Sequence, residues 1–196
     1  MAIELTARSG STFNLHLGNP DRLNATTLED WSTLRTPLAE AAAEPALRAL
    51  LITTEGRHFC AGADLELLLA LTEMGAPARR ETLAVGSDLV RDLIRFRART
   101  VAAVDGAAVG IGACLALACD DVLVTPEARF SLIFTALGIP AGDMAAPWLI
   151  KRRVGGRTAS RLLLGAIDVD VDTSIRLGLA RGQRTLVRWT FQPKGP

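Results

Sequence analysis

An excess of charge of either sign is missing from this chain of 196 residues. Its 22 Lys and Arg stand against 21 Asp and Glu, which gives a formal net charge of +1. Proteins that bind nucleic acid or anionic membranes through their overall field carry a clear positive excess. We therefore expect no nucleic-acid partner, and any anion must be held by a local feature of the fold.

Long hydrophobic runs are also missing. The apolar stretches are interrupted by Asp, Gly or Arg well before the length that spans a bilayer. The first ten residues, MAIELTARSG, lack the basic stretch followed by an apolar one that marks a secretory signal. These absences predict a soluble, cytoplasmic protein with no membrane partner.

Cysteine is scarce and tyrosine is absent. Cys60, Cys114 and Cys119 are odd in number and lie inside apolar runs, which predicts reduced, buried thiols rather than a disulfide framework. No spacing typical of metal ligands occurs, so we expect no metal. With 49% hydrophobic but only 5% aromatic residues, the core should be built from small aliphatic side chains.

The apolar pattern alternates between the periods of strands and helices. Phe13, Leu15 and Leu17 predict a strand that leaves His16 on its exposed side. Thr26 and Glu29 have capping-box spacing, so we expect a helix over 26–43 that Pro37 kinks. Further strands are predicted at 49–54, 101–104 and 122–124, and further helices at 65–73, 79–97, 112–118, 144–154, 157–164 and 171–178. This alternation predicts one α/β domain.

Two glycine-bearing turns follow predicted strands and lead into predicted helices, at residues 58–64 (HFCAGAD) and 109–113 (VGIGA). Such turns present backbone N–H groups at helix N-termini, where an oxyanion is favoured. The simpler interpretation is that the glycines only relieve crowding in tight connections, and one such turn is weak evidence. The occurrence of both turns in one chain favours an oxyanion site.

At these residues the chain resembles the crotonase family, also called the enoyl-CoA hydratase/isomerase family. The resemblance spans about residues 3–181 and rests on two long segments, GRHFCAGADLELL at 56–68 and VAAVDGAAVGIGACLALACDD at 101–121. Shorter matches include PDRLNA at 20–25, ARF at 128–130, LGIP at 137–140 and RVG at 153–155. It implies an α/β fold of the crotonase type, a ββα spiral, and a homo-oligomer, either a trimer or a hexamer.

The resemblance also implies the site residues. The amides of Ala63 and Ile111 would donate to the carbonyl oxygen of an acyl-CoA thioester, the implied substrate. Coenzyme A would then be part of the substrate, with no tightly bound cofactor, and Arg22, Ala61, Ala63, Asp64 and Leu65 would help to hold it. Asp64 has an alternative role as the N-cap of the following helix. Ile111 is β-branched, so a turn that required a positive φ there would be distorted.

The expected proton-transfer residues depart from the family pattern. Where hydratase members carry two glutamates, this chain has Cys114 and Phe134, and Cys114 is interpreted as a core residue. Neither side chain can deprotonate water, which argues against ordinary hydration. Asp143 falls where isomerase-like relatives carry an aspartate, if one residue is inserted. It is an acid–base group, the N-cap of a helix beginning near Met144, or both.

The resemblance ends near Arg181. We expect a crotonase-like acyl-CoA-binding core over 1–181, a divergent tail over 182–196, and most of the family's C-terminal helical region to be missing. Two functions remain open. The first is an enzyme of fatty-acid-type acyl-CoA metabolism, a lyase or isomerase, with isomerase-like proton transfer favoured over hydration. The second is a catalytically degenerate protein of the same fold that binds coenzyme A or has a structural role.

Overall fold

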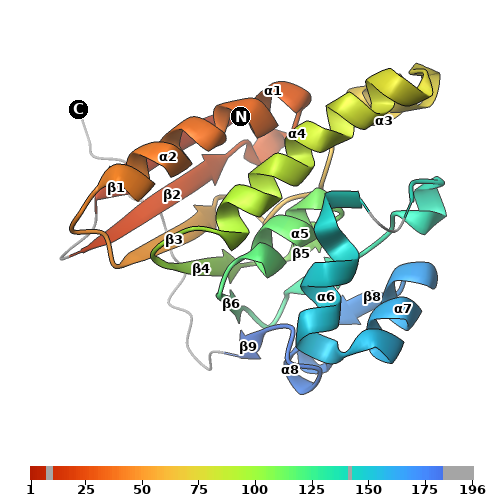
Figure 1. Cartoon of the computed structure of the whole chain (residues 1–196). Coiled ribbons are helices and arrows are strands. Elements are labelled where there is room, and N and C mark those ends of the chain that lie inside the picture. Colours follow the sequence, from red (N-terminus) through yellow and green to blue (C-terminus); the bar gives the residue numbers. More distant parts are fainter. Residues whose placement is uncertain (8–10, 141–142, 183–196) are drawn as a thin grey trace.

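The expected alternation of strands and helices is present in the computed structural model, which describes residues 1–7, 11–140 and 143–182. Six strands of the described part form the main sheet in the order β1-β2-β3-β4-β6-β9 (Figure 1). They are β1 (Ala2–Ala7), β2 (Thr12–Gly18), β3 (Ala49–Thr54), β4 (Arg99–Val104), β6 (Asp121–Val124) and β9 (Arg181–Gly182). Within the described part of this main sheet, the β1–β2 pair is antiparallel and the other neighbouring strands are parallel. A smaller sheet joins β5 (Ala107–Val109), β7 (Arg129–Ser131) and β8 (Asp168–Asp170).

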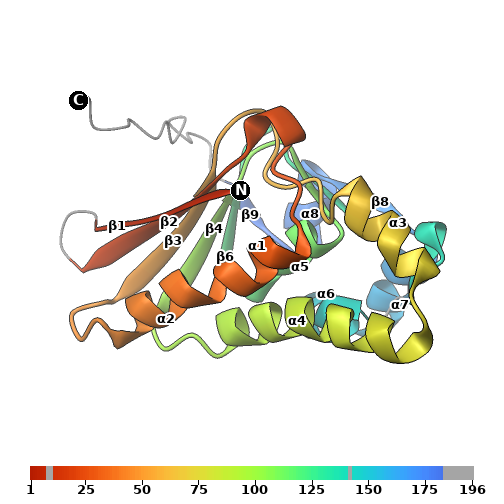
Figure 2. The same cartoon turned by 90° about the horizontal axis from the view of Figure 1, so that it is seen from above.

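The helices lie in two groups around the main sheet. α1 (Leu28–Thr33), α2 (Arg35–Ala43) and α4 (Ala76–Ile94) run along one face of it, as Figure 2 shows. α3 (Leu65–Glu73), α6 (Ala146–Val154), α7 (Gly156–Leu164) and α8 (Val171–Arg176) lie toward the end that holds β8. α5 (Ile111–Ala118) packs between β4, β5, α4 and α6, and every one of its residues is buried. The fold therefore surrounds the N-terminus of α5 with other elements.

The core follows from the period of each element. Alternate strand residues face the helices, among them Leu15 and Leu17 of β2 and Leu50 and Ile52 of β3. Trp31, Leu34 and Leu38 complete the layer from α1 and α2, on the stripe that the sequence predicts.

Several elements match their sequence predictions. β3 and α3 have the predicted bounds, and the strands at 101–104 and 122–124 lie within β4 and β6. The helix predicted over 26–43 is in fact two helices that divide at Leu34. Pro37 lies in the first turn of α2, where its missing N–H breaks no helical hydrogen bond.

The predicted cap of the first helix was wrong by one residue. Thr27, not Thr26, is the N-cap of α1, and it forms a capping box with Asp30. Asp30 also accepts a hydrogen bond from the N-terminal ammonium of Met1 at 2.9 Å. The correction matters because it leaves the Thr26 side chain available for a different contact.

His16 was predicted on an exposed side of its strand, and this is also wrong. The residue is 5% exposed, and its Nδ1 lies 3.1 Å from the hydroxyl of Thr53, which in turn donates to Asn14 at 3.0 Å. β1, which the sequence reading had not predicted, flanks β2 on one side and β3 flanks it on the other. Burial lowers the pKa of His16, against the opposing effect of Glu55 and Glu4.

Two further expectations concern the ends of the fold. Of the predicted tail at 182–196, the structure describes only Gly182, and the rest lies outside the described residues. Gly182 belongs to β9 and pairs with Val124 of β6. None of the described helices has both the length and the apolar character needed to cross a bilayer.

Candidate active site

The first glycine-bearing turn connects β3 to α3 and leaves the amide of Ala63 unbonded. Thr26 and Ala63 form a parallel bridge, in which the Thr26 N–H donates to the Gly62 carbonyl at 2.7 Å and the Thr26 carbonyl accepts from the Asp64 N–H at 2.9 Å. Because successive peptide groups of an extended chain point to opposite sides, the Ala63 N–H points away from Thr26. Within the described residues it donates to no other group.

The second turn connects β5 to α5 and leaves the amide of Ile111 in the same condition. Gly110 donates to the Ser131 carbonyl at 2.9 Å and then turns the chain with φ 52° and ψ −118°. Ile111 is the first residue of α5, and its N–H belongs to the first helical turn, which has no intrahelical acceptor. Gly110 at the N-cap has no side chain to accept it. The residue with a positive φ is Gly110, so the backbone at Ile111 does not have the distortion that its β-branched side chain would cause at a positive φ.

The two turns touch through backbone atoms. A Cβ on Gly62, whose φ is 95°, would lie 2.9 Å from the Val109 carbonyl oxygen. A Cβ on Gly112 would lie 2.7 Å from both the Cβ and the carbonyl oxygen of Cys60. Cys60 also pairs with Ala108, accepting from the Val109 N–H at 2.9 Å. Glycine at both positions lets the turns approach closely enough for their free amides to face one cleft.

A cleft lies against both turns. Ala61, Gly62 and Ala63 line it from the first turn, and Val109, Gly110 and Ile111 from the second. The remaining lining residues are apolar: Trp31, Leu68, Leu71, Leu83, Ile133, Phe134, Leu137, Ile139 and Met144. No described side chain that lines the cleft is ionisable.

The segment from Asn19 to Ala25 supports the first turn from below. Asn24 is buried, with φ 55°, and its side-chain amide donates to the carbonyls of Glu55 and His58 at 2.8 and 2.7 Å. The Ala61 N–H donates to the Leu23 carbonyl at 3.0 Å. This explains why a motif early in the sequence accompanies the turn at 58–64: it fixes the backbone on which Ala63 lies.

The residues predicted to hold coenzyme A lie around the first turn but differ in exposure. Ala61 and Ala63 line the cleft, whereas Leu65 is 69% exposed at the start of α3. Asp64 is the N-cap of α3, and its carboxylate accepts from the Leu67 N–H at 2.8 Å, which confirms its alternative role. Arg22 is half exposed and lies 3.9 Å from the Asp64 carboxylate. Whether these groups contact coenzyme A stays a prediction.

The positions of the proton-transfer candidates are partly defined. Cys114 is fully buried in α5, which confirms that it belongs to the core, and Phe134 lines the cleft. Asp143 begins a 3-10 helix beside the cleft residue Met144, but its side chain lies outside the described part of the structure. The capping alternative for Asp143 was wrong, because α6 begins at Ala146 with Ala145 at its N-cap.

The paired questions of thiol and metal chemistry depend on the cysteines and on the grouping of possible ligands. Burial raises the pKa of Cys60 and of Cys119 to about 12, so both are neutral thiols at physiological pH. Among the described residues there is no group of three or more His, Cys, Asp or Glu that could hold a metal ion.

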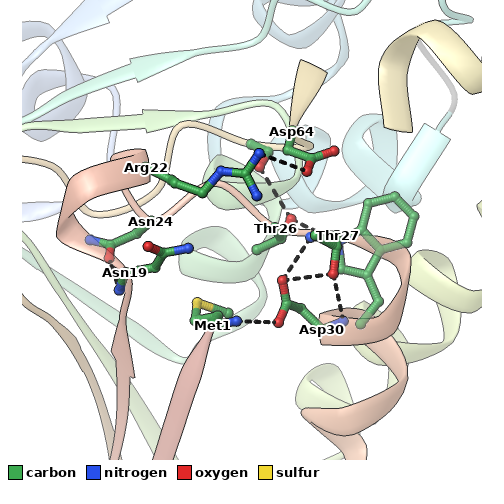
Figure 3. A network of polar contacts seen from close by, with 10 residues as sticks. Met1, Asn19, Arg22, Asn24, Thr26, Thr27, Asp30 and Asp64 are labelled. Carbon is green, nitrogen blue, oxygen red and sulfur yellow. Dashed lines mark hydrogen bonds and ion pairs between the residues drawn. The ribbon is translucent and has the colours of Figure 1, made fainter. Parts of the chain in front are cut away.

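Sequence analysis missed the role of Thr26 and Trp31. The indole N–H of Trp31 donates to the Thr26 hydroxyl at 2.8 Å, and that hydroxyl lies 3.2 Å from the Gly62 carbonyl oxygen. Figure 3 shows Thr26 beside the capping residues Thr27 and Asp30. The sequence showed Trp31 as part of an apolar stripe and Thr26 as a cap. The available signal was the pair of adjacent threonines, of which only one is needed to cap α1.

Comparison with known proteins identifies the fold. The family model described as Enoyl-CoA hydratase/isomerase matches residues 7–182. The chain belongs to the enoyl-CoA hydratase/isomerase family. Its structure resembles that of an enoyl-CoA hydratase from Polaromonas sp. JS666 with a TM-score of 0.83 and 30% identity, covering 92% of this chain and 69% of that one. The α/β architecture is thus of the crotonase type, as expected.

Two curated members of the enoyl-CoA hydratase/isomerase family show how far the similarity extends. "Probable enoyl-CoA hydratase EchA14" of Mycobacterium tuberculosis is 38% identical over 164 residues, which are 84% of this chain and 62% of that protein. The 1,2-epoxyphenylacetyl-CoA isomerase of Escherichia coli is 35% identical over 153 residues, 76% of this chain and 57% of that protein. The chain thus spans about three fifths of the length of these relatives.

Proposed function

We propose that this member of the enoyl-CoA hydratase/isomerase family binds an acyl-CoA thioester and stabilises its enolate with the amides of Ala63 and Ile111. The observation that supports this most is the pair of unbonded amides at one apolar cleft. A thioester oxygen gains negative charge as the enolate forms, and a fixed donor in a dry site is worth about 3 kcal/mol of barrier. The start of α5 adds a favourable helix dipole at Ile111.

For the thioester itself, the first turn offers the contacts that the family resemblance implies. Arg22 is a half-exposed cation suited to a coenzyme A phosphate. Ala61 and Ala63 line the cleft, and Asp64 and Leu65 follow them at the start of α3. The apolar lining of the cleft, including Leu71, Leu83 and Ile133, suits a hydrocarbon acyl group.

Isomerase-like proton transfer fits the lining better than hydration does. Hydration needs groups that orient and deprotonate a water molecule, and Phe134 and the buried Cys114 can do neither. In an isomerisation, one base removes a proton beside the thioester and returns it at another carbon of the same enolate, so one acidic residue suffices. Asp143, next in sequence to Met144 of the cleft, is the residue we assign to this role.

A second candidate function is binding without turnover. It is favoured by the absence of an ionisable side chain among the described residues that line the cleft. Such a protein would retain the thioester site but would not move protons.

Assays of the purified chain separate these functions. A 3-enoyl-CoA gains ultraviolet absorbance when it becomes the conjugated 2-enoyl-CoA, whereas a 2-enoyl-CoA loses absorbance on hydration. We expect the first change to be the faster. Calorimetry with free coenzyme A and with acetoacetyl-CoA, which forms an enolate, measures binding in parallel. Binding without either absorbance change would select the second function.

Substitution at Ala63 tests the donor directly. Ala63→Pro deletes the N–H, so it should weaken acetoacetyl-CoA about 100-fold while changing free coenzyme A little. Ala63→Gly keeps the N–H and is the matched control, which should retain the wild-type preference. Equal losses for both ligands in the proline variant would contradict the oxyanion role.

A further inference from the structure

The peptide group between Gly62 and Ala63 accepts two hydrogen bonds from a single residue, Thr26, and a third hydrogen bond to Thr26 holds the next peptide group. The Thr26 N–H and hydroxyl both lie within hydrogen-bond distance of the Gly62 carbonyl oxygen, at 2.7 and 3.2 Å, and the Thr26 carbonyl accepts from Asp64. In a trans peptide the C=O and N–H point in opposite directions. Fixing the Gly62 oxygen toward Thr26 therefore aims the Ala63 N–H toward the other side.

The direction of the hydrogen bonds through the Thr26 hydroxyl follows from its partners. The indole N–H of Trp31 can only donate, and it lies 2.8 Å from the Thr26 oxygen. The hydroxyl oxygen thus accepts from Trp31, and its own proton is free to point to the Gly62 carbonyl. A hydrogen-bond network therefore runs from Trp31 through Thr26 to the peptide group that carries the Ala63 N–H.

This hydrogen-bond network is shielded from water, and the side chains that form it are held in place by packing. Thr26 and Trp31 are each 1% exposed. The Trp31 ring lines the cleft and packs closely on Gly86 of α4, where an added Cβ would lie 3.0 Å from the ring. Hydrogen bonds in such surroundings strengthen one another, and those received by a carbonyl make the N–H of the same peptide a better donor.

We propose that Thr26 and Trp31 are positioning residues that aim and polarise the Ala63 amide. The proposal rests on the proposed function, in which that amide binds the thioester oxygen. It also explains why the capping role falls to Thr27, since the Thr26 hydroxyl is used by the first turn. The indole N–H of Trp31 reaches the Ala63 amide only through Thr26, so it tunes the donor without being one.

The test compares variants that keep or remove one hydrogen-bonding group. Thr26→Val removes the hydroxyl at nearly constant volume, Thr26→Ser keeps it, and Trp31→Phe removes the indole N–H. Thr27→Val is the matched control, because it deletes a neighbouring hydroxyl that contacts only α1 residue Asp30. Each purified chain is titrated calorimetrically with acetoacetyl-CoA and with free coenzyme A.

We expect Thr26→Val to weaken acetoacetyl-CoA about tenfold relative to free coenzyme A, as the loss of one hydrogen bond would. Thr26→Ser should retain most of the preference, and Trp31→Phe should lose a smaller part. Combining Thr26→Val with Trp31→Phe should add nothing to Thr26→Val alone, because the indole acts through the hydroxyl. Thr27→Val should lower stability and leave the preference unchanged.

A second readout does not depend on any ligand. The amide proton resonance of Ala63 in the free protein should move upfield in Thr26→Val and Trp31→Phe but stay nearly in place in Thr26→Ser and Thr27→Val. If the wild-type chain binds the two ligands equally, the proposed function fails, and the inference is then decided by this resonance alone. An unchanged Ala63 resonance in Thr26→Val, or equal weakening of both ligands, would overturn the inference.

Discussion

Replacing Gly62 by alanine should destabilise the fold more than the same replacement at a turn glycine that has open space around it. Gly62 has φ 95°, a conformation that costs an alanine about 1–2 kcal/mol. The new Cβ would also lie 2.9 Å from the Val109 carbonyl oxygen, a backbone atom that cannot swing away. Overpacking of this kind adds about 1–3 kcal/mol, so we expect a total loss of about 2–5 kcal/mol.

Gly138→Ala isolates the conformational part of this cost. Gly138 has φ 68° and ψ 13°, but nothing lies within 4 Å of an added Cβ. It should lose only about 1 kcal/mol. Urea unfolding of both variants measures the difference, and the melting temperature should fall by roughly 5–15 °C for Gly62→Ala. If Gly62→Ala is no less stable than Gly138→Ala, the backbone contact between the two turns is not what requires glycine at residue 62.

Three further predictions concern other parts of the molecule. If the chain turns over an acyl-CoA, Asp143→Asn should lower kcat about 100-fold with little loss of stability, and an unchanged kcat would remove Asp143 from the mechanism. Because burial lowers the pKa of His16 below 6.5, the unfolded state takes up the proton first as the pH falls, so this contribution to stability is complete above pH 6.5 and declines below it. Urea unfolding at about pH 7.5 and 5.5 should show a smaller decline in His16→Gln than in the wild type, and equal declines would show that His16 is not responsible. Arg153 donates to the Leu117 carbonyl at 3.2 Å and also to the Cys119 carbonyl, at the C-terminal end of α5, so Arg153→Met should cost about 1–3 kcal/mol in urea unfolding, and a cost near zero would contradict this capping role.

Elements with one strong period were predictable from sequence. β3 reads as a short apolar run between polar residues, and α3 follows a residue, Asp64, that caps helices well. β1 was missed although Ile3 and Leu5 alternate as its neighbour β2 does. The short strands of the second sheet carry only three residues each, too few for a period to be recognised.

Contacts between distant segments were less predictable. Both Thr26 and Thr27 are good N-caps with an acidic residue three positions on, so local pattern alone could not choose between them. The choice depends on Trp31 and Gly62, which meet the Thr26 hydroxyl only in the folded chain. The predicted exposure of His16 was wrong for a similar reason, since the alternation of apolar and polar residues does not tell whether the polar side of a strand is covered.

The turns of the candidate site were predictable in kind but not in register. The concern about Ile111 assumed that it carries the left-handed conformation of the second turn. In the structure the preceding Gly110 carries it, and Ile111 begins a helix with an ordinary backbone. A β-branched residue is acceptable there because a helical backbone suits isoleucine and its buried side chain packs into the core.

The proposed chemistry has two parts, stabilisation of the oxyanion and transfer of a proton, and they place different demands on the sequence. Any residue other than proline at 63 and 111 provides an N–H, whereas proton transfer needs particular side chains. Phe134 supplies no acid–base group, but as an apolar lining residue it lowers the polarity around the amides. In such surroundings a fixed N–H dipole stabilises a developing oxyanion more strongly than it would in water. In the function that we propose, the same residue would disfavour hydration, because it excludes water and offers no base, and it would favour an enolate whose proton is moved by one acidic residue.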